Sequence, residues 1–501
     1  MHHKEIKAIV RKQLKSQYPN WRKLTKKEKK SIAKSVLNEV ISTYDFNEPV
    51  SIPFEELVGI QSQVNPQGII KLDGMGRFIA NNKRDKLISF DEKRRHSLLS
   101  EDQELKLLDE LLDNDVLNSI LSYEGYSPAM RDFFPSHFLR AELLKAIKYP
   151  EISYRKFCSK EYLGRNQKLN RLFIGLPLNT NRAIHHVQLS QFRSQLTFSQ
   201  MINLMNYVLY LFQESAILGD QVIHCIDSTE LAVDNQQLLA SLQIRGKKIR
   251  IYDDIDCDCG KRRNKRDKSP YVVGYRMHTL TAIDAKTGHS YPLISLLAPA
   301  NHHDSNFHSP LVQLAQAIGL DVKLVTADEA YSDSDGQFYK TTGTHLVTPP
   351  SAKVLTPENV NPETMEVMCD DHCEFPMEYV GIEDGEHEFK CGIDNGTCFR
   401  ESVCPKYRSI PIDNGIFQRI LYNKDDVAKA IEIRKNGERP FNLLKKREGL
   451  ETVRVRSQHA ILARCTFTTM ATLLLEITQT RKKEKPKAKQ RQIGIPFAMA
   501  S

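Results

Sequence analysis

The sequence predicts an α/β protein in which a mostly helical N-terminal region precedes a mixed sheet flanked by helices. Three observations carry this prediction. Apolar residues recur at helical spacing between residues 102 and 220. Two short apolar runs, 222–226 and 322–325, have the length and composition of buried strands. A helical segment at 431–446 follows a long insertion, roughly residues 340–425, so the last helix of the sheet comes late in the chain.

The N-terminal region begins with a stretch, residues 1–45, that is predicted to be helical. Thr25 and Glu28 form a capping-box pattern that opens the run KKEKKSIAKSVLNEVIS. Residues 46–100 contain several prolines and glycines, and their pattern assigns them no role. From Asp102 to about Asp220 apolar positions recur at helical spacing, which predicts a helical domain.

Two aspartates follow the predicted buried strands. Asp227 is expected at the exit of a short strand formed by 222–226, and Asp328 at the end of 322–325. Carboxylates at strand ends place hard oxygen ligands at a sheet edge, where Mg²⁺ can keep some of its waters. The alternative for each aspartate is a capping role at the following helix or turn. Further strands are expected at 271–283 and 289–297, and a helix at 310–318.

The segment IEIRKNGERPFNLLKK places Arg434, Glu438 and Lys445 at intervals of four and seven residues. On one continuous helix these positions return to one face, with an acid between two cations. Such a stripe suits a site that handles phosphates and metal ions, although a solvated salt-bridge ladder has the same pattern. Pro440 favours a helix start or a kink near Glu438, which would break the stripe.

Together these features resemble a DDE transposase of the insertion-sequence type, which has a ribonuclease H-like core. The family signature near its third acid is Tyr-x2-Arg-x3-Glu-x6-Lys, which Arg434, Glu438 and Lys445 match. The stretch SPYVVGYRMHTLTAIDAKTGHSYPLISLLAPANHHDS is similar to the central hairpin of the family, and ERPFNLLKKREGLETVRVRS to its catalytic helix. SHFLRAELLKAIKYPEISYRKFCSKEYLGRNQKLNRLFIGLPLNTNRAIHHVQLSQFRSQL is similar to its helical domain. The resemblance covers roughly residues 130–475.

The resemblance implies that Asp227, Asp328 and Glu438 are catalytic and hold two Mg²⁺ (or Mn²⁺) ions. Arg434 and Lys445 would contact DNA phosphates. The implied reaction is cleavage of DNA at transposon ends and strand transfer into target DNA. The implied partners are double-stranded DNA, as ends and as target, and a second copy of the chain in a homodimeric synaptic complex.

The chain departs from the family pattern at two places. Ile431 stands where the signature has a tyrosine. Hairpin-forming members of the family stack a flipped base on a tryptophan within the insertion. The only tryptophan of this chain, Trp21, lies near the N-terminus, outside the insertion. Other aromatic side chains of the insertion could serve, since stacking tolerates any aromatic ring. They are Phe375, Tyr379, Phe389 and Phe399.

The insertion is also rich in cysteine. It holds half of the 10 cysteines, namely Cys369, Cys373, Cys391, Cys398 and Cys404. Clustered thiolates in a reducing compartment suggest a structural Zn²⁺ site. The first pair is spaced C-x3-C rather than C-x2-C, so reduced, partly buried thiols are the alternative.

The charge of the chain suits a polyanionic partner. The formal net charge is +9, and the basic residues gather in 1–36, 245–268 and the tail 481–501. Such clusters favour nucleic acid, with a contribution that weakens as salt rises, although lysine-rich termini are also common as solvated tails. The segment up to residue 45 is the candidate for binding the element ends.

These features divide the chain into a basic N-terminal region (1–100, candidate DNA-binding), a helical domain (101–220), a ribonuclease H-like catalytic domain (221–480, with the Cys-rich insertion at about 340–425) and a basic tail (481–501). No apolar run approaches the roughly 18 residues of a membrane span, and the N-terminus lacks a signal core. Cysteine is too sparse for a disulfide scaffold. The expected location is the cytoplasm, in association with the nucleoid and without a membrane partner.

Two other functions fit the same residues: a ribonuclease H-like nuclease without strand transfer, and a domesticated, non-catalytic DNA-binding protein. Among nearby polar residues, Asp328 is preferred to Glu329, which a continuing strand would turn to the opposite face. His302 and His303 are expected in a surface loop, and Asp304 is a weaker candidate for the site.

Overall fold

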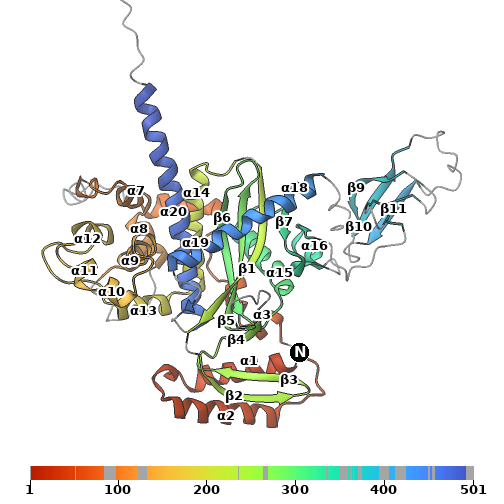
Figure 1. The fold of residues 1–501 in the computed structure, drawn as a ribbon, viewed down its shortest axis with the longest axis horizontal. Coiled ribbons are helices and arrows are strands. Elements are labelled where there is room, and N and C mark those ends of the chain that lie inside the picture. Colours follow the sequence, from red (N-terminus) through yellow and green to blue (C-terminus); the bar gives the residue numbers. More distant parts are fainter. Residues whose placement is uncertain are drawn as a thin grey trace, which may run out of the picture.

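The computed structural model confirms the α/β class, with a helical N-terminal region and a mixed sheet covered by helices (Figure 1). It describes residues 2–50, 52–83, 97–121, 133–219, 221–234, 236–262, 269–333, 337–349, 359–361, 364, 366–369, 375–393, 406–411, 425–448, 452–453 and 457–491. The C-terminal end of the 34-residue helix α20 projects from the body.

Among the described residues, the main sheet has seven strands and is mixed. They are β1 (Val222–Val233), β4 (Asp258–Lys261), β5 (Tyr271–Asp284), β6 (Ser290–Pro299), β7 (Leu324–Ala327), β8 (His345–Val347) and β12 (Thr452–Val453). The order is β4-β5-β1-β7-β8, with β6 also beside β5 and β12 beside β1. β1 runs antiparallel to β5 and parallel to β7. The predicted strands at 271–283 and 289–297 therefore exist as β5 and β6.

Helices lie on both faces of this sheet. The elements after β6 are η3 (Asp304–Asn306), α15 (His308–Ala317), η4 (Glu329–Tyr331), α16 (Gln337–Thr342), α18 (Asp425–Arg434), η6 (Lys435–Glu438), α19 (Arg439–Glu448) and α20 (Gln458–Arg491). The turn η6 packs on the Cys225 side of β1, since Gly437 lies against that thiol. Phe307, at the start of α15, stacks on His278 of β5. His278 pairs with Ser228, which points to the opposite face from Cys225.

The helical region packs directly against the sheet. Its elements are α3 (Phe54–Val58), α4 (Gln61–Val64), α5 (Leu72–Asn82), α7 (Gln103–Leu111), α8 (Asn114–Leu121), α9 (Pro135–Lys148), α10 (Tyr154–Phe157), α11 (Lys160–Leu163), α12 (Lys168–Ile174), α13 (His186–Gln195) and α14 (Phe198–Glu214). One hydrophobic core contains residues of these helices, of the sheet and of α20. Described residues on both sides of the predicted boundary at residue 220 contribute to this core.

Helix α20 is the one element in the described part of the chain that is long and apolar enough to cross a membrane, over Gln458–Lys483. Threonines interrupt its apolar run in the sequence, yet the mean hydropathy of its apolar window is 1.4. That window is 89% buried inside the protein, against α9, α14 and β6. It is the central core helix of the fold.

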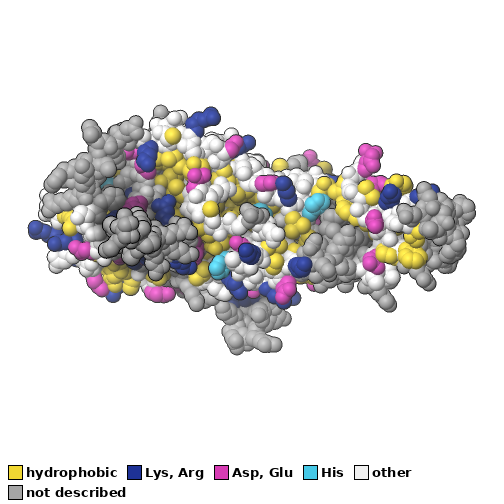
Figure 2. Space-filling model, turned by 90° about the horizontal axis from the view of Figure 1, so that it is seen from above, with side chains coloured by type: hydrophobic (Ala, Val, Ile, Leu, Met, Phe, Trp, Pro, Cys, Tyr) yellow, Lys and Arg dark blue, Asp and Glu magenta, His cyan; other side chains and the backbone are white. Residues whose placement is uncertain are grey.

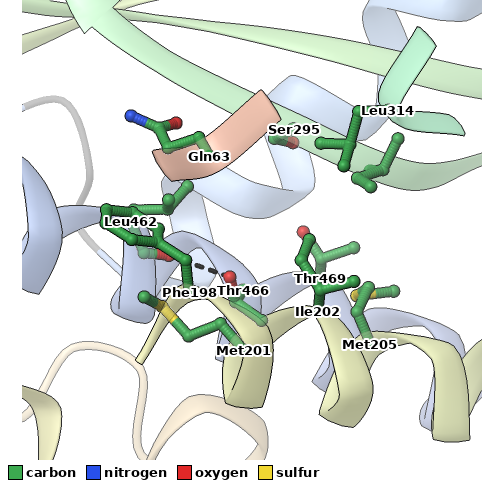
Figure 3. Close-up of a pocket in the computed structure, with 11 residues that line it drawn as sticks. Gln63, Phe198, Met201, Ile202, Met205, Ser295, Leu314, Leu462, Thr466 and Thr469 are labelled. Atoms are coloured by element: carbon green, nitrogen blue, oxygen red, sulfur yellow. Dashed lines mark hydrogen bonds between the residues drawn. The ribbon is translucent and has the colours of Figure 1, made fainter. Parts of the chain in front are cut away.

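Strand β6 pairs with β5 alone among the described strands, and side chains bond to its other backbone groups. Gln63 donates to the carbonyl oxygen of Leu297 and accepts from its N–H, at 3.0 and 2.9 Å, and Gln458 donates to the same carbonyl oxygen at 2.5 Å. Beside these contacts lies a small cavity between α4, α14, α15, α20 and β6 (Figure 3). Its lining is mostly apolar and contains no acid or base, so it is a packing void.

The first two helices form a separate small unit with a β-hairpin from the middle of the chain. We call it the N-terminal module; it consists of α1 (His2–Gln17), η1 (Trp21–Lys23), α2 (Lys26–Thr43), β2 (Leu238–Ile244) and β3 (Lys247–Tyr252). Its own core includes Val10 and Leu37 of the helices and Ile249 and Ile251 of β3. The predicted capping box of Thr25 and Glu28 is present at the start of α2.

Ion pairs attach the N-terminal module to a short acidic loop, Asp253–Asp258, which precedes and begins β4. Lys7 pairs with Asp258, Lys15 with Asp256 at 2.7 Å and Lys29 with Asp253 at 2.9 Å. Arg11 also lies 3.7 Å from Asp256. Part of the positive charge of residues 1–36 is therefore neutralised within the chain.

A second small sheet lies within the insertion, at the end of the molecule farthest from the helical region (Figure 1). It consists of β9 (Met377–Glu383), β10 (Glu386–Cys391) and β11 (Tyr407–Pro411), in the order β11-β10-β9. It has its own core, which includes Cys369, Met377, Phe389 and Ile410.

Candidate active site

The central strand β1 carries Asp227. The structure corrects the prediction that this residue ends a short strand, because β1 continues for six residues beyond it, to Val233. The pairing with β5 is uninterrupted from Val222 to Ala232 and keeps the chain extended past the aspartate. Asp227 is half-buried, and its Oδ1 accepts a 2.7 Å hydrogen bond from the N–H of Ser228.

Asp328 follows directly after the neighbouring parallel strand β7. Ile226 of β1 is the register partner of Ala327, the last residue of β7, so Asp227 and Asp328 each come one residue after this pair. Neighbouring strands lie about 4.8 Å apart. Asp328 is also the N-cap of η4 and accepts from the N–H of Ala330 at 2.9 Å. Asp328 therefore both caps η4 and lies beside Asp227.

Glu438 approaches from η6. A Cβ atom built on Gly437 would stand 2.6 Å from Sγ of Cys225, so the backbone of η6 lies directly on β1. Cys225 is two residues before Asp227 and points to the same face of the strand. The side chain of Glu438 is exposed, and its charge acts on Asp227. Residues 211 positions apart in sequence are thus brought to one side of the sheet.

The pKa of Asp227 shows that the other two acids act on its carboxyl. Its pKa is raised to about 7, first because burial disfavours its charge and further because Asp328 and Glu438 repel it. The Ser228 N–H and the guanidinium of Arg434 act in the opposite direction without cancelling the effect. An acid desolvated beside two other acids is a common arrangement at functional sites.

Arg434, at the end of α18, acts on the carboxyl of Asp227, whereas Lys445 lies farther along the chain, on α19. The guanidinium of Arg434 is half-buried, and its Nε has no hydrogen-bond partner among the described residues. Lys445 is half-buried on α19. The three residues do not share one continuous α-helix, because the 3-10 turn η6 separates α18 from α19. Pro440, at the second position of α19, is consistent with this break.

The donor set fits a hard divalent cation. Three carboxylates supply only oxygen, the ligand that Mg²⁺ and Mn²⁺ prefer, and a cation would relieve the repulsion on Asp227. The set is not preassembled, however. Within the described ranges, no three His, Cys, Asp or Glu side chains stand close enough together to hold a metal ion.

A buried polar chain supports both aspartates from the opposite face of the sheet. His278 of β5 is fully buried, and its Nδ1 lies 2.9 Å from the hydroxyl of Tyr331. Tyr331 ends η4, the turn that Asp328 caps, and its hydroxyl also interacts with the side chain of Ser228. Burial lowers the pKa of His278 to about 4, so its ring is neutral at pH 7.

A buried ion pair continues this support. Arg276, two residues before His278 on β5, binds Oδ1 of Asp304 at 2.8 Å and lies 3.8 Å from Glu230 of β1. Asp304, a weaker candidate for the site, binds Arg276 instead of joining the three acids. The sequence did contain a signal for Arg276 and His278. Polar residues at alternate positions of an otherwise apolar strand point to one face and need buried partners.

Of the two histidines expected in a surface loop, one is exposed and one is buried, and the strand before Glu329 ends at Ala327 rather than continuing. Glu329 is exposed next to Asp328, and His303 is exposed as well. His302 is buried, which corrects the expectation of a surface loop. Its ring packs edge-on against Phe54 and Phe307, and burial keeps its pKa well below the usual value.

Some of the aromatic and cysteine residues singled out in the insertion lie within the described residues. Phe389 lies in the small core, which removes it as a base-stacking candidate, and Tyr379 is half-buried against it. Phe375 is 59% exposed. Cys369 is buried and Cys391 is half-buried. The other residues of these two predictions lie outside the described residues: Phe399, Cys373, Cys398 and Cys404.

Comparison with known proteins agrees with this geometry. A family model described as "Transposase DDE domain" matches residues 218–474, which is just over half of the chain and includes all three acids. No curated protein matches the chain. The match begins shortly before β1 and ends within α20, so it spans the mixed sheet, the insertion and the helices α18 and α19. The chain therefore belongs to the transposase DDE domain family, whose fold is ribonuclease H-like.

Proposed function

We propose that this protein is a DNA transposase that cleaves DNA at the ends of a mobile element and joins those ends to target DNA. Asp227, Asp328 and Glu438 are the proposed catalytic acids. One observation supports this assignment most directly: the carboxyl of Asp227 has a pKa of about 7, raised in part by both of the other acids. Membership of the family supports the general activity.

The proposed reaction has two displacements at phosphorus. In the first, water attacks a phosphodiester at the element end and releases a 3′-hydroxyl. In the second, this hydroxyl attacks a target phosphodiester, so one P–O bond forms as another breaks and no external energy is required. Two Mg²⁺ or Mn²⁺ ions bound by the three carboxylates would supply Lewis acidity and lower the pKa of the attacking water or hydroxyl. Arg434, whose Nε lacks a partner in the described part of the chain, would bind a phosphate beside the acids, and Lys445 a more distant one.

The proposed partners follow from the charge of the chain. Double-stranded DNA is the substrate, as element ends and as target, and two copies of the chain would hold two ends together. The net charge of +9 supports a polyanionic partner. Lysines on the solvent side of α2 remain exposed without an ion pair among the described residues, which supports a DNA-binding role for the N-terminal region. They are Lys26, Lys27, Lys30 and Lys34. The proposed location is the nucleoid within the cytoplasm.

The test is a cleavage assay on the inverted repeats that flank the gene, with Mg²⁺ or Mn²⁺. Each of Asp227→Ala, Asp328→Ala and Glu438→Ala is expected to abolish cutting while binding of the ends is nearly unchanged. Glu329→Gln is the matched control, because it removes an exposed acid next to Asp328 and is expected to leave cutting intact. Substantial cutting by any of the three alanine variants would remove that residue from the site.

The same assay separates the two other functions. Cutting without joining of the 3′-hydroxyl to a supercoiled target would identify a nuclease without strand transfer. Binding of the ends without cutting by the wild type would identify a non-catalytic DNA-binding protein.

A further inference from the structure

The hairpin β2–β3 is a two-stranded ribbon with one face covered and one face open. Ala240, Ile249 and Ile251 face the core that the ribbon shares with α1 and α2. The residues that alternate with these along each strand point to the opposite face of the ribbon. Two cross-strand pairs define this second face, Ser241 with Arg250 and Gln243 with Lys248. We call these four residues the outer face of the ribbon.

The outer face is polar and positively charged. Gln243 and Lys248 are exposed, and Ser241 and Arg250 are half-buried. Neither Lys248 nor Arg250 has an ion-pair partner in the part of the chain that the structure describes. The whole ribbon, residues 238–252, contains four cations and no acid. An outer face with amide, hydroxyl and cationic side chains and no acid favours an anionic partner.

Three lysines of the N-terminal module have a different role. Lys7, Lys15 and Lys29 bind the acidic loop and so hold the N-terminal module to the body. On the face of the molecule drawn in Figure 2, basic and acidic side chains are interspersed among the described residues. The outer face of the ribbon differs from these three lysines because its cations have no ion-pair partner among the described residues. It differs from the face in Figure 2 because it contains no acid.

The ribbon is also connected directly to the strand that carries Asp227. Beyond Asp227, β1 continues to Val233, and β2 begins at Leu238. At about 3.3 Å per residue, the tip of the ribbon lies within about 60 Å of Asp227 along the chain. A duplex of about 18 base pairs, at roughly 3.4 Å per base pair, would span this upper limit.

We propose that the outer face of the β2–β3 ribbon binds duplex DNA, with Lys248 and Arg250 on phosphates. A two-stranded ribbon has the dimensions of the DNA major groove, and Ser and Gln side chains suit its base edges. This proposal rests on the proposed function, because it takes DNA as the substrate. It assigns part of the DNA contact to a segment inside the catalytic region, rather than to the N-terminal helices alone.

The test measures binding of a random 30-base-pair duplex to the full chain, in a chelator and over a range of salt concentrations. Lys248→Gln/Arg250→Gln is expected to reduce the slope of log affinity against log salt by about two. At 0.1 M salt the affinity should fall on the order of fiftyfold, as two phosphate contacts are lost. Lys248→Arg/Arg250→Lys should keep the wild-type slope.

Lys160→Gln/Lys168→Gln is the matched control, because it removes two exposed cations from the helical region. It should bind as the wild type does, and all variants should show the wild-type melting temperature. A ribbon variant that binds with the slope and affinity of this control would overturn the proposal. The measurement contains no divalent metal, so it is independent of cutting. If the ribbon variant reduces the slope but the wild type never cuts DNA, the DNA-binding role of the outer face stands and the proposed transposase function is wrong.

Discussion

The hydroxyl of Tyr331 lies 2.9 Å from Nδ1 of His278, and both side chains are fully buried. Tyr331 closes the turn that Asp328 opens, through a 3.0 Å bond from its N–H to the carbonyl oxygen of Asp328. Its hydroxyl also interacts with Ser228, the residue after Asp227. One phenol thus connects the two strands that carry the aspartates.

Tyr331→Phe is expected to lower the free energy of unfolding by about 1–3 kcal/mol, because it leaves buried polar atoms unsatisfied. It should also raise the Mg²⁺ concentration needed for DNA cleavage, since the two aspartates lose a shared support. Tyr207→Phe removes another buried phenol hydroxyl, bonded at 2.7 Å to the carbonyl oxygen of Leu111 in the helical region. That control should lose similar stability in urea titrations without a change in Mg²⁺ requirement. Equal Mg²⁺ curves for both variants would contradict the positioning role of Tyr331.

Asp227→Asn is expected to stabilise the metal-free protein at alkaline pH. The pKa of Asp227 is about 7 in the folded chain and near 3.8 when unperturbed, so the folded state holds the proton more tightly. Stability is then present in full below about pH 4 and is lost as pH rises towards 7. Without this acid, the variant should exceed the wild type by on the order of 2 kcal/mol at pH 8 and by little at pH 4. Urea unfolding in a chelator measures both values, and an equal difference at the two pH values would refute the assignment.

Gly437→Ala should impair catalysis through sterics alone. The added methyl would stand 2.6 Å from Sγ and 3.2 Å from Cβ of Cys225, so η6 must move away from β1 and carry Glu438 with it. A shift of about 1 Å can reduce a rate on the order of a hundredfold. The double variant Gly437→Ala/Cys225→Ala removes the clashing sulfur and should recover most of the cleavage rate. If the double variant is as slow as the single one, the contact does not set the position of Glu438.

The Arg276–Asp304 pair should behave as a coupled unit. Both side chains are buried, so Arg276→Met or Asp304→Leu alone should cost about 3–5 kcal/mol, because each leaves a buried charge without this partner. The double variant should cost less than the sum of the two. A double-mutant cycle from urea titrations measures the difference, and strict additivity would show that the pair is not coupled.

The sequence alone determined the local elements of this protein. Alternating and helical apolar patterns located β5, β6 and α15, and the capping box at Thr25 opens α2 as expected. The spacing of Arg434, Glu438 and Lys445 indicated the family, which the family match supports. These signals depend on residues within about a dozen positions of each other, where backbone geometry fixes which side chains share a face.

Only the tertiary structure decided how those elements meet. The register of Ile226 with Ala327 sets Asp227 beside Asp328, and the long pairing with β5 extends β1 past its acid. The packing of α1 and α2 against β2–β3 determines which lysines bind the acidic loop and which remain exposed, as in the pair of Lys7 with Asp258, 251 residues apart. Such contacts depend on burial and charge across distant segments, and no local pattern in the chain encodes them.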